Sequence, residues 1–188
     1  MRGRKLIEIQ TANFGAIKNK IKNLCTNYPV RLVYPIYEEK WILTVDENGR
    51  ILRKRKSPKK GTIFDLFNEL IRCPWLINEK NFSLEVLFIK AEEIRCQDGK
   101  GSWRRKGLSI KDRKLLDVNH SIIFNNKEDF LPLIHKDIPQ PFTNRMFSQY
   151  LDITISQATR ATYCFKKMKC IKEVGKKGNA ILYSKDPF

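Results

Sequence analysis

The carboxy-terminal segment 142–183 constrains the fold of this chain more than any other part. A threonine stands before each of two helical runs, at 144–151 and 155–169, and the apolar residues of the second run recur at helical spacing. Short strand-like pieces follow within residues 171–183, and the turn that joins them contains two glycines. This order predicts a compact unit of two helices and a β-hairpin.

The same order of elements is the layout of a winged helix, in which one helix enters the major groove of DNA and the hairpin touches the backbone. With residues 155–169 as the recognition helix, Arg160 suits bidentate contact with guanine and Gln157 suits adenine. Ser156 lies at the start of that helix, where free backbone N–H groups favour a phosphate. We expect these three residues to make the contacts at the bases.

Lysines of the same unit are expected at the DNA backbone. Lys176 and Lys177 lie at the tip of the hairpin, and Lys167 lies on the solvent face of the helix. Contacts of this kind fix the register of a protein on DNA without reading its sequence. A winged helix can also serve protein contacts or dimerisation, and this alternative stays open because a fold alone does not settle function.

Positive charge is concentrated in separate stretches of the chain. The 188 residues include 37 Lys and Arg against 20 Asp and Glu, a formal net charge of +17, which favours a polyanionic partner, most often nucleic acid. Seven cationic residues lie in each of the segments 50–60, 98–114 and 160–177. The indole of Trp103 offers a surface for stacking on an exposed base. In the first two segments, secondary backbone contacts are expected from Arg53, Arg55, Arg104 and Arg105.

The fold class expected for the whole chain is α+β. Residues 1–27 form a basic lead-in with a short helix. Residues 28–135 combine strand segments rich in β-branched and aromatic side chains with a helix, and they predict a mixed α/β domain. A proline-containing linker at 138–141 introduces a carboxy-terminal winged-helix domain at 136–188.

Several segments resemble known proteins. Residues 141–143, 174–176 and 178–183 resemble the winged-helix domains of prokaryotic DNA-binding proteins. Over most of the chain, other segments are similar to a prokaryotic family that has no assigned activity. Those segments are residues 28–32, 81–87 and 92–95.

A metal-dependent nuclease, or a subunit derived from one, in a defence or mobile-element system is the first alternative function. It would use Glu69 and Glu85 with Mg²⁺, and Lys90 near the attacking water. Lys90 lies five residues after Glu85 and on the other side of a strand, so the acidic-x-Lys spacing of such nucleases is missing. The second alternative is an assembly subunit of a nucleoprotein complex, whose winged helix holds a protein partner.

Other classes of function have little support in the sequence. The five cysteines form no CxxC pair and there are only two histidines, so no metal site is expected, and the cysteines are expected to be reduced. No cofactor is expected, apart from Mg²⁺ under the nuclease alternative. No apolar run approaches the roughly 20 residues that span a bilayer, which excludes a membrane partner and predicts a cytoplasmic protein.

The leading expectation is therefore a non-enzymatic nucleic-acid-binding protein. Double-stranded DNA is the expected partner, bound through the carboxy-terminal winged helix and the additional basic clusters. The sequence leaves open whether the partner is DNA or RNA.

Overall fold

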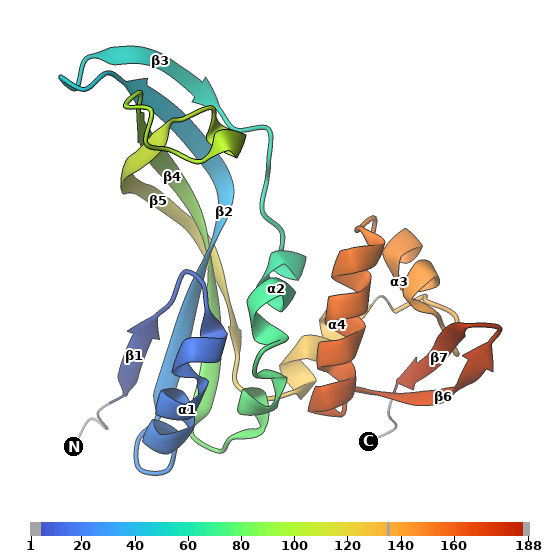
Figure 1. Ribbon diagram of the computed structural model, residues 1–188. Coiled ribbons are helices and arrows are strands. Elements are labelled where there is room, and N and C mark those ends of the chain that lie inside the picture. The colour runs from blue at the N-terminus through green and yellow to red at the C-terminus, as the bar shows by residue number, and fades with distance from the viewer. Residues whose placement is uncertain (1–4, 135, 186–188) are drawn as a thin grey trace. The chain divides into compact units, whose positions relative to one another are not determined.

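The computed structural model describes residues 5–134 and 136–185 (Figure 1). His135 and the first four residues of the lead-in lie outside the described residues. In chain order, the helices and strands are β1 (Leu6–Ile9), α1 (Phe14–Cys25), β2 (Val30–Val45), β3 (Ile51–Lys56), η1 (Ile63–Leu66), α2 (Phe67–Leu70), η2 (Pro74–Asn78), β4 (Phe82–Cys96), η3 (Trp103–Arg105), β5 (Ser109–Phe124), η4 (Glu128–Leu133), α3 (Asn144–Tyr150), α4 (Ile155–Met168), β6 (Ile171–Lys177) and β7 (Ala180–Lys185).

The chain forms two compact units, and the long strands contribute residues to both. Unit 2 consists of residues 35–62 and 87–121, and unit 1 takes the remaining described residues. This division differs from the expected domains 1–27, 28–135 and 136–188, which stay predictions. In unit 1, the carboxy-terminal helices and hairpin are grouped with the amino-terminal residues.

A mixed sheet of five strands joins most of the β-structure, in the order β1-β2-β4-β5, with β3 also paired to β2. β1 runs parallel to the first residues of β2, whereas β3 runs antiparallel to its last residues. β1 lies in the part of the chain that the sequence predicted as a lead-in with only a helix. The expected mixed α/β architecture is confirmed.

Phenylalanine rings make up much of the core of unit 1. Phe67 of α2 packs edge-on against Phe165 of α4, with ring centroids 5.1 Å apart, and lies 6.5 Å from Phe130. Phe165 also contacts Phe147 of α3, at 6.0 Å. A shared aromatic cluster of this kind ties the carboxy-terminal helices to the short helices that follow residue 62.

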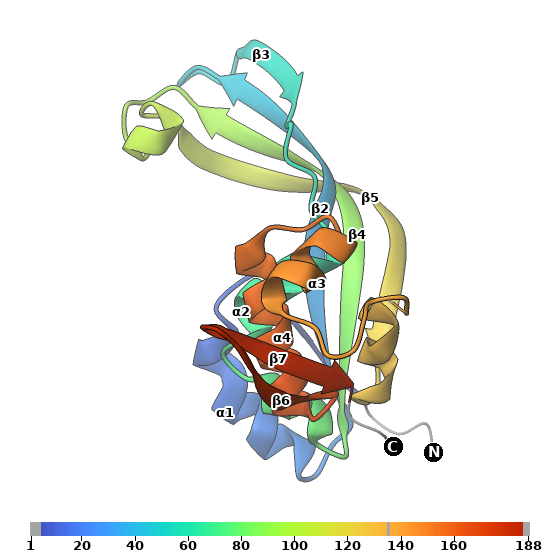
Figure 2. The same ribbon diagram turned by 90° about the vertical axis from the view of Figure 1, so that its right-hand side faces the viewer.

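Side-chain caps fix the starts of both carboxy-terminal helices. The hydroxyl of Thr143 accepts a hydrogen bond from the backbone N–H of Met146, at 3.2 Å. Thr154 and Gln157 form a reciprocal capping box at the start of α4. After α4, the antiparallel pair β6 and β7 forms the hairpin (Figure 2). The predicted order of two helices and a hairpin is therefore present.

Helix α4 is packed on several sides within unit 1. It contacts α3, the short helices η1, α2 and η2, and the start of the hairpin. Ala158, Ala161 and Phe165 are fully buried. The small alanine side chains allow close approach of the neighbouring backbone. Only a narrow stripe of the helix stays exposed, made of Ile155, Ser156, Thr159, Tyr163 and Lys167.

The five cysteines are all free and buried. Burial raises the pKa of the Cys73 thiol to about 12, and it raises that of Cys170 to about 12. These thiols therefore stay protonated and act as small core residues. In the described part of the chain, no helix is both long and apolar enough to cross a membrane.

Replacement of Phe165 by alanine tests whether the carboxy-terminal helices share the core of unit 1. We expect Phe165→Ala to lower the free energy of unfolding by about 3–5 kcal/mol, because a fully buried ring leaves a cavity. Urea denaturation followed by circular dichroism measures this value. The control is the exposed Tyr163→Ala, for which a change within about 0.5 kcal/mol is expected. A loss confined to a separate unfolding step of residues 136–188 would contradict the shared core.

Candidate functional site

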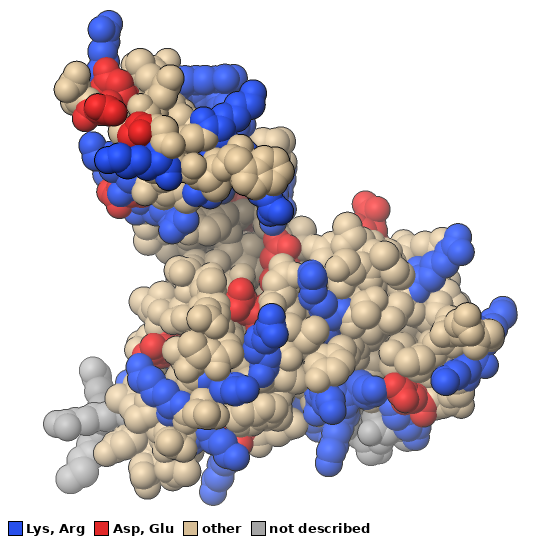
Figure 3. Space-filling view, in the orientation of Figure 1, with Lys and Arg blue, Asp and Glu red and all other residues tan. Residues whose placement is uncertain are grey.

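Unit 2 contains an open cavity of about 270 Å³, and six of its nine lining residues are Arg or Lys. No acidic residue lines it. In the space-filling view, Lys and Arg cover much of this part of the chain (Figure 3). We call it the arginine cavity, and its lining residues are Ile42, Thr44, Arg53, Arg55, Arg95, Arg104, Arg105, Lys106 and Leu108.

Strand β3 places two arginines in the arginine cavity through the alternation of side chains. Arg55 is opposite Ile42 on β2, and Arg53 is opposite Thr44. Since alternate residues of a strand point to opposite faces, Arg53 and Arg55 share one face, and Lys54 points to the other. The run of cations in β3 is thereby divided into an arginine side and a lysine side.

The lysine side carries acidic partners, which the arginine side of β3 lacks. Lys54 forms an ion pair with Glu92 at 2.8 Å, and Lys56 pairs with Glu39. Hydrogen bonds from Lys56, Trp41 and Lys90 lower the pKa of Glu39 to about 2. Among the described residues, neither Arg53 nor Arg55 pairs with a carboxylate.

The loop 97–108 supplies the other wall of the arginine cavity and is held by its own backbone. The N–H of Gly101 donates to the carbonyl of Gly107 at 2.8 Å. A Cβ on Gly101 would lie 1.9 Å from the carbonyl oxygen of Leu108, so only glycine fits there. Asp98 accepts hydrogen bonds from the Ser109 hydroxyl, at 2.7 Å, and from a backbone N–H, and these bonds lower the pKa of Asp98. These bonds give the loop a defined conformation.

Within that loop, the short helix η3 orients two of the arginines. The Nε of Arg105 donates to the carbonyl of Leu108 at 3.2 Å. The guanidinium of Arg104 lies 5.5 Å from the centre of the Trp103 ring. Neither contact neutralises the charge, and both leave donor N–H groups for a ligand.

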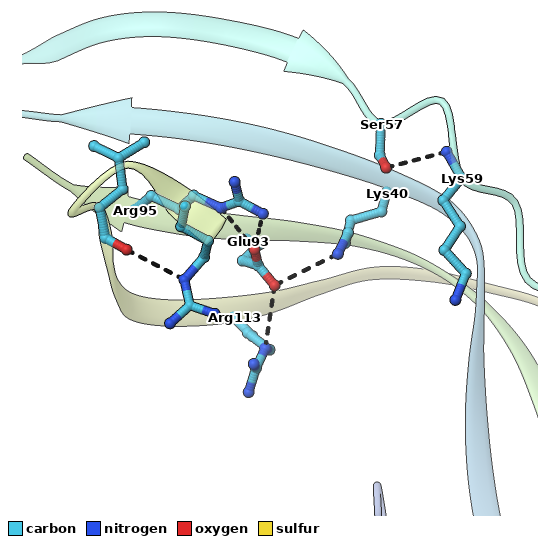
Figure 4. A network of polar contacts seen from close by, with 8 residues as sticks. Lys40, Ser57, Lys59, Glu93, Arg95 and Arg113 are labelled. Atoms are coloured by element: carbon cyan, nitrogen blue, oxygen red, sulfur yellow. Dashed lines mark hydrogen bonds and ion pairs between the residues drawn. The ribbon is translucent and has the colours of Figure 1, made fainter. Parts of the chain in front are cut away.

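Glu93 is a buried carboxylate on β4 that pairs with Arg95, one of the residues lining the arginine cavity (Figure 4). Glu93 forms ion pairs with Arg95 at 2.7 Å, with Lys40 at 3.5 Å and with Arg113 at 3.5 Å. Burial opposes ionisation of Glu93 and is the largest single effect. The hydrogen bond from Arg95 and the charges of the three cations together outweigh it, so the pKa of Glu93 is lowered. One negative charge here offsets only part of the surrounding positive charge.

The structure brings together four residues that the sequence proposed as secondary contacts. Arg53 and Arg55 come from one basic segment, Arg104 and Arg105 come from another, and all four line the arginine cavity. Sequence reasoning did not propose Arg95 as a contact, and mentioned residues 92–95 only for their similarity to a prokaryotic family. The position of Arg95 two residues after Glu93 is the signal that places both side chains on one face.

Two of the residues proposed to contact bases form hydrogen bonds within unit 1, and the third is exposed. Arg160 donates to the side-chain carbonyl of Asn68 at 2.6 Å, and the amide of Gln157 donates to Asp65 at 3.4 Å. These bonds direct both side chains toward η1 and α2 of the same unit. Ser156 is exposed, and so are the backbone-contact candidates Lys167, Lys176 and Lys177.

The residues of the nuclease alternative have separate partners. Glu69 accepts a hydrogen bond from the backbone N–H of Phe14 at 3.2 Å, and Glu85 pairs with Arg31 at 3.1 Å. Lys90 pairs with Glu39 at 3.2 Å. Within residues 5–134 and 136–185, no group of three or more His, Cys, Asp or Glu side chains is arranged to hold a metal ion.

Replacement of Glu93 tests its role as the shared partner of Lys40, Arg95 and Arg113. Because the pKa of Glu93 is lowered below 4.5 in the folded state, its carboxylate stabilises the fold above about pH 4.5. That contribution is lost as the pH falls through the folded-state pKa. We expect Glu93→Gln to lower the free energy of unfolding by about 1–3 kcal/mol at neutral pH, and to flatten the loss of stability on acidification.

Urea titrations at several pH values between about 7 and about 3 measure this dependence. Glu47→Gln is the control, because Glu47 is exposed in the turn between β2 and β3. Parallel pH profiles for wild type and Glu93→Gln would show that Glu93 has no such role.

Comparisons with known proteins identify the family. Residues 1–125 match the model of a family described as "Domain of unknown function (DUF8091)". A protein of Treponema pallidum (strain Nichols), described as "Uncharacterized protein", is 30% identical, and the match covers 97% of this chain and 72% of that protein. No solved structure matches. The expected similarity to a prokaryotic family without assigned activity is confirmed, and the chain belongs to the DUF8091 family.

Proposed function

We propose that this protein binds nucleic acid without catalysing a reaction, and that the arginine cavity of unit 2 is its main phosphate-binding site. The observation that carries this proposal is the convergence of five arginines and a lysine on one cavity that no carboxylate lines. Holding like charges together costs free energy, which a bound anion offsets. Arginine also matches phosphate geometry, since its planar guanidinium donates two parallel hydrogen bonds.

A polyanion fits the charge of the chain better than a single small anion. The net charge of +17 is far larger than one phosphate group requires. The lysines of the hairpin and of the exposed stripe on α4 add cations beyond the arginine cavity. A nucleic-acid backbone presents phosphates in series, so it can engage several such groups.

We propose further that the carboxy-terminal unit is a winged helix that contacts the backbone of duplex DNA. Its exposed lysines are Lys167, Lys176 and Lys177. Gln157 and Arg160 are engaged with Asp65 and Asn68, so this proposal assigns them a packing role rather than base recognition. Binding of this kind holds the duplex with little dependence on its sequence.

The phosphate role of the arginine cavity is tested by the double variant Arg53→Gln/Arg55→Gln. We expect it to weaken nucleic-acid binding about tenfold or more, because each charge-assisted hydrogen bond contributes about 1.5–3 kcal/mol. The slope of log affinity against log salt should become shallower by up to about 2, since two phosphate contacts are lost. Fluorescence anisotropy at several salt concentrations measures both quantities.

The matched control is Arg50→Gln/Lys59→Gln, which removes the same charge from exposed positions of the same segment outside the arginine cavity. An equal loss of affinity in both double variants would show that only net charge matters. Wild-type binding that does not change with salt would overturn the proposed function.

The role of the carboxy-terminal unit is tested by comparing its lysines with Arg160. We expect Lys176→Gln/Lys177→Gln to reduce affinity for all duplexes to the same extent and to lower the salt slope by about 1–2. Arg160→Ala should lower thermal stability, because it leaves Asn68 without its partner, and should leave the ranking of different duplex sequences unchanged. A change in that ranking for Arg160→Ala would restore the base-reading role.

A further inference from the structure

Trp103 is the most exposed large hydrophobic side chain in the described part of the chain. It is 83% exposed, whereas the next most exposed large apolar side chains reach 67% and 64%. A tryptophan normally buries its ring, since the indole provides a large apolar surface. An indole left in water at this level has a free face for a ligand.

The two other tryptophans of the chain are engaged with their own domain. The indole N–H of Trp41 donates to Glu39 at 2.8 Å, and Lys54 and Lys56 lie over its ring. Lys22 lies over the ring of Trp75 at 5.4 Å. Both side chains are half-buried. Exposure of the ring is therefore specific to Trp103.

Trp103 is adjacent in sequence to residues that line the arginine cavity. The next three residues, Arg104, Arg105 and Lys106, all line that cavity. Trp103 begins the short helix η3, and the hydrogen bonds of the loop 97–108 hold this helix in place. The aromatic ring and the cations are therefore presented together on one ordered loop.

We infer that this site binds an unpaired nucleotide, whose base stacks on Trp103 while its phosphates occupy the arginine cavity. Bases inside a duplex are covered by their neighbours on both faces, so an indole reaches a base face only where the strand is single, ends or is splayed apart. The ligand class is therefore single-stranded nucleic acid or a duplex with a single-stranded extension. This inference rests on the proposed phosphate role of the arginine cavity.

The combination also predicts weak dependence on base identity. Every base has a π face, and the arginine cavity recognises phosphate, which all nucleotides share. The guanidinium of Arg104 lies over the Trp103 ring, 5.5 Å from its centre, so a base would stack on the opposite face of the indole. The site thus selects for strandedness rather than for sequence.

The test compares Trp103→Leu and Trp103→Phe in anisotropy titrations at fixed low salt. The ligands are labelled oligonucleotides of about 12 nucleotides, within the roughly 4–16 that one single-strand site covers. They are supplied as single strands of DNA and of RNA, and as a blunt DNA duplex. We expect Trp103→Leu to weaken single-strand binding by about 5- to 150-fold, the loss of one stacking contact. Trp103→Phe should retain most of the affinity, and blunt-duplex binding should stay within about twofold.

Tyr28→Leu is the matched control, because Tyr28 is an aromatic residue of unit 1 that is 47% exposed. Intrinsic fluorescence gives a second readout: single strands should quench the emission of the wild type more than that of Trp103→Phe. The DNA and RNA arms show whether the 2′-hydroxyl contributes.

Each outcome separates this inference from the proposed function. Trp103→Leu could weaken single-strand and duplex binding equally, or could weaken neither of them. If Arg53→Gln/Arg55→Gln weakens both kinds of binding in the same experiment, the phosphate site stands and the unpaired-nucleotide inference is wrong. If the arginine variant has no effect on any ligand, the proposed function itself fails. A selective loss on single strands in Trp103→Leu alone supports base stacking at this loop.

Discussion

The stability of unit 2 depends on ion pairs between a few carboxylates and a larger number of Lys and Arg side chains. Glu93 is buried and pairs with Lys40, Arg95 and Arg113, so one negative charge stabilises three cations on a single face of the sheet. On the lysine side, Glu92 and Glu39 neutralise the lysines of β3. Removal of these acids would leave like charges a few ångströms apart in a partly buried setting, where repulsion is strong.

The positive charge of the arginine side, which no carboxylate neutralises, is the physical basis of the proposed function. Neither Arg53 nor Arg55 has an acidic partner in the described chain, and the glycine-dependent loop places more cations opposite them. A cavity built in this way is stabilised by an external anion, because the fold supplies too few carboxylates itself. The exposed Trp103 on the same loop adds an aromatic surface, which binding of a phosphate group alone does not require.

Prediction from sequence succeeded where local rules decide the outcome. Thr143 and Thr154 cap the two carboxy-terminal helices as helix-start rules indicate, and the hairpin follows them. Arg53, Arg55, Arg104 and Arg105 were proposed as secondary backbone contacts from charge density alone, and that role stays a prediction. Sequence reasoning predicted base contacts for Gln157 and Arg160, because helical periodicity does not show which neighbouring element covers a polar face of a helix.

The mixed α/β fold, the carboxy-terminal helix–helix–hairpin and the large excess of positive charge can all be predicted from the amino-acid sequence. Those properties follow from residue type and spacing, which act over a few residues. Three outcomes depend on the tertiary structure: segments 50–60 and 98–114 line one cavity, Glu93 pairs with Arg95 of that cavity, and α4 packs on α2. These outcomes depend on strand pairing and on contacts between residues far apart in the chain, which no local pattern encodes.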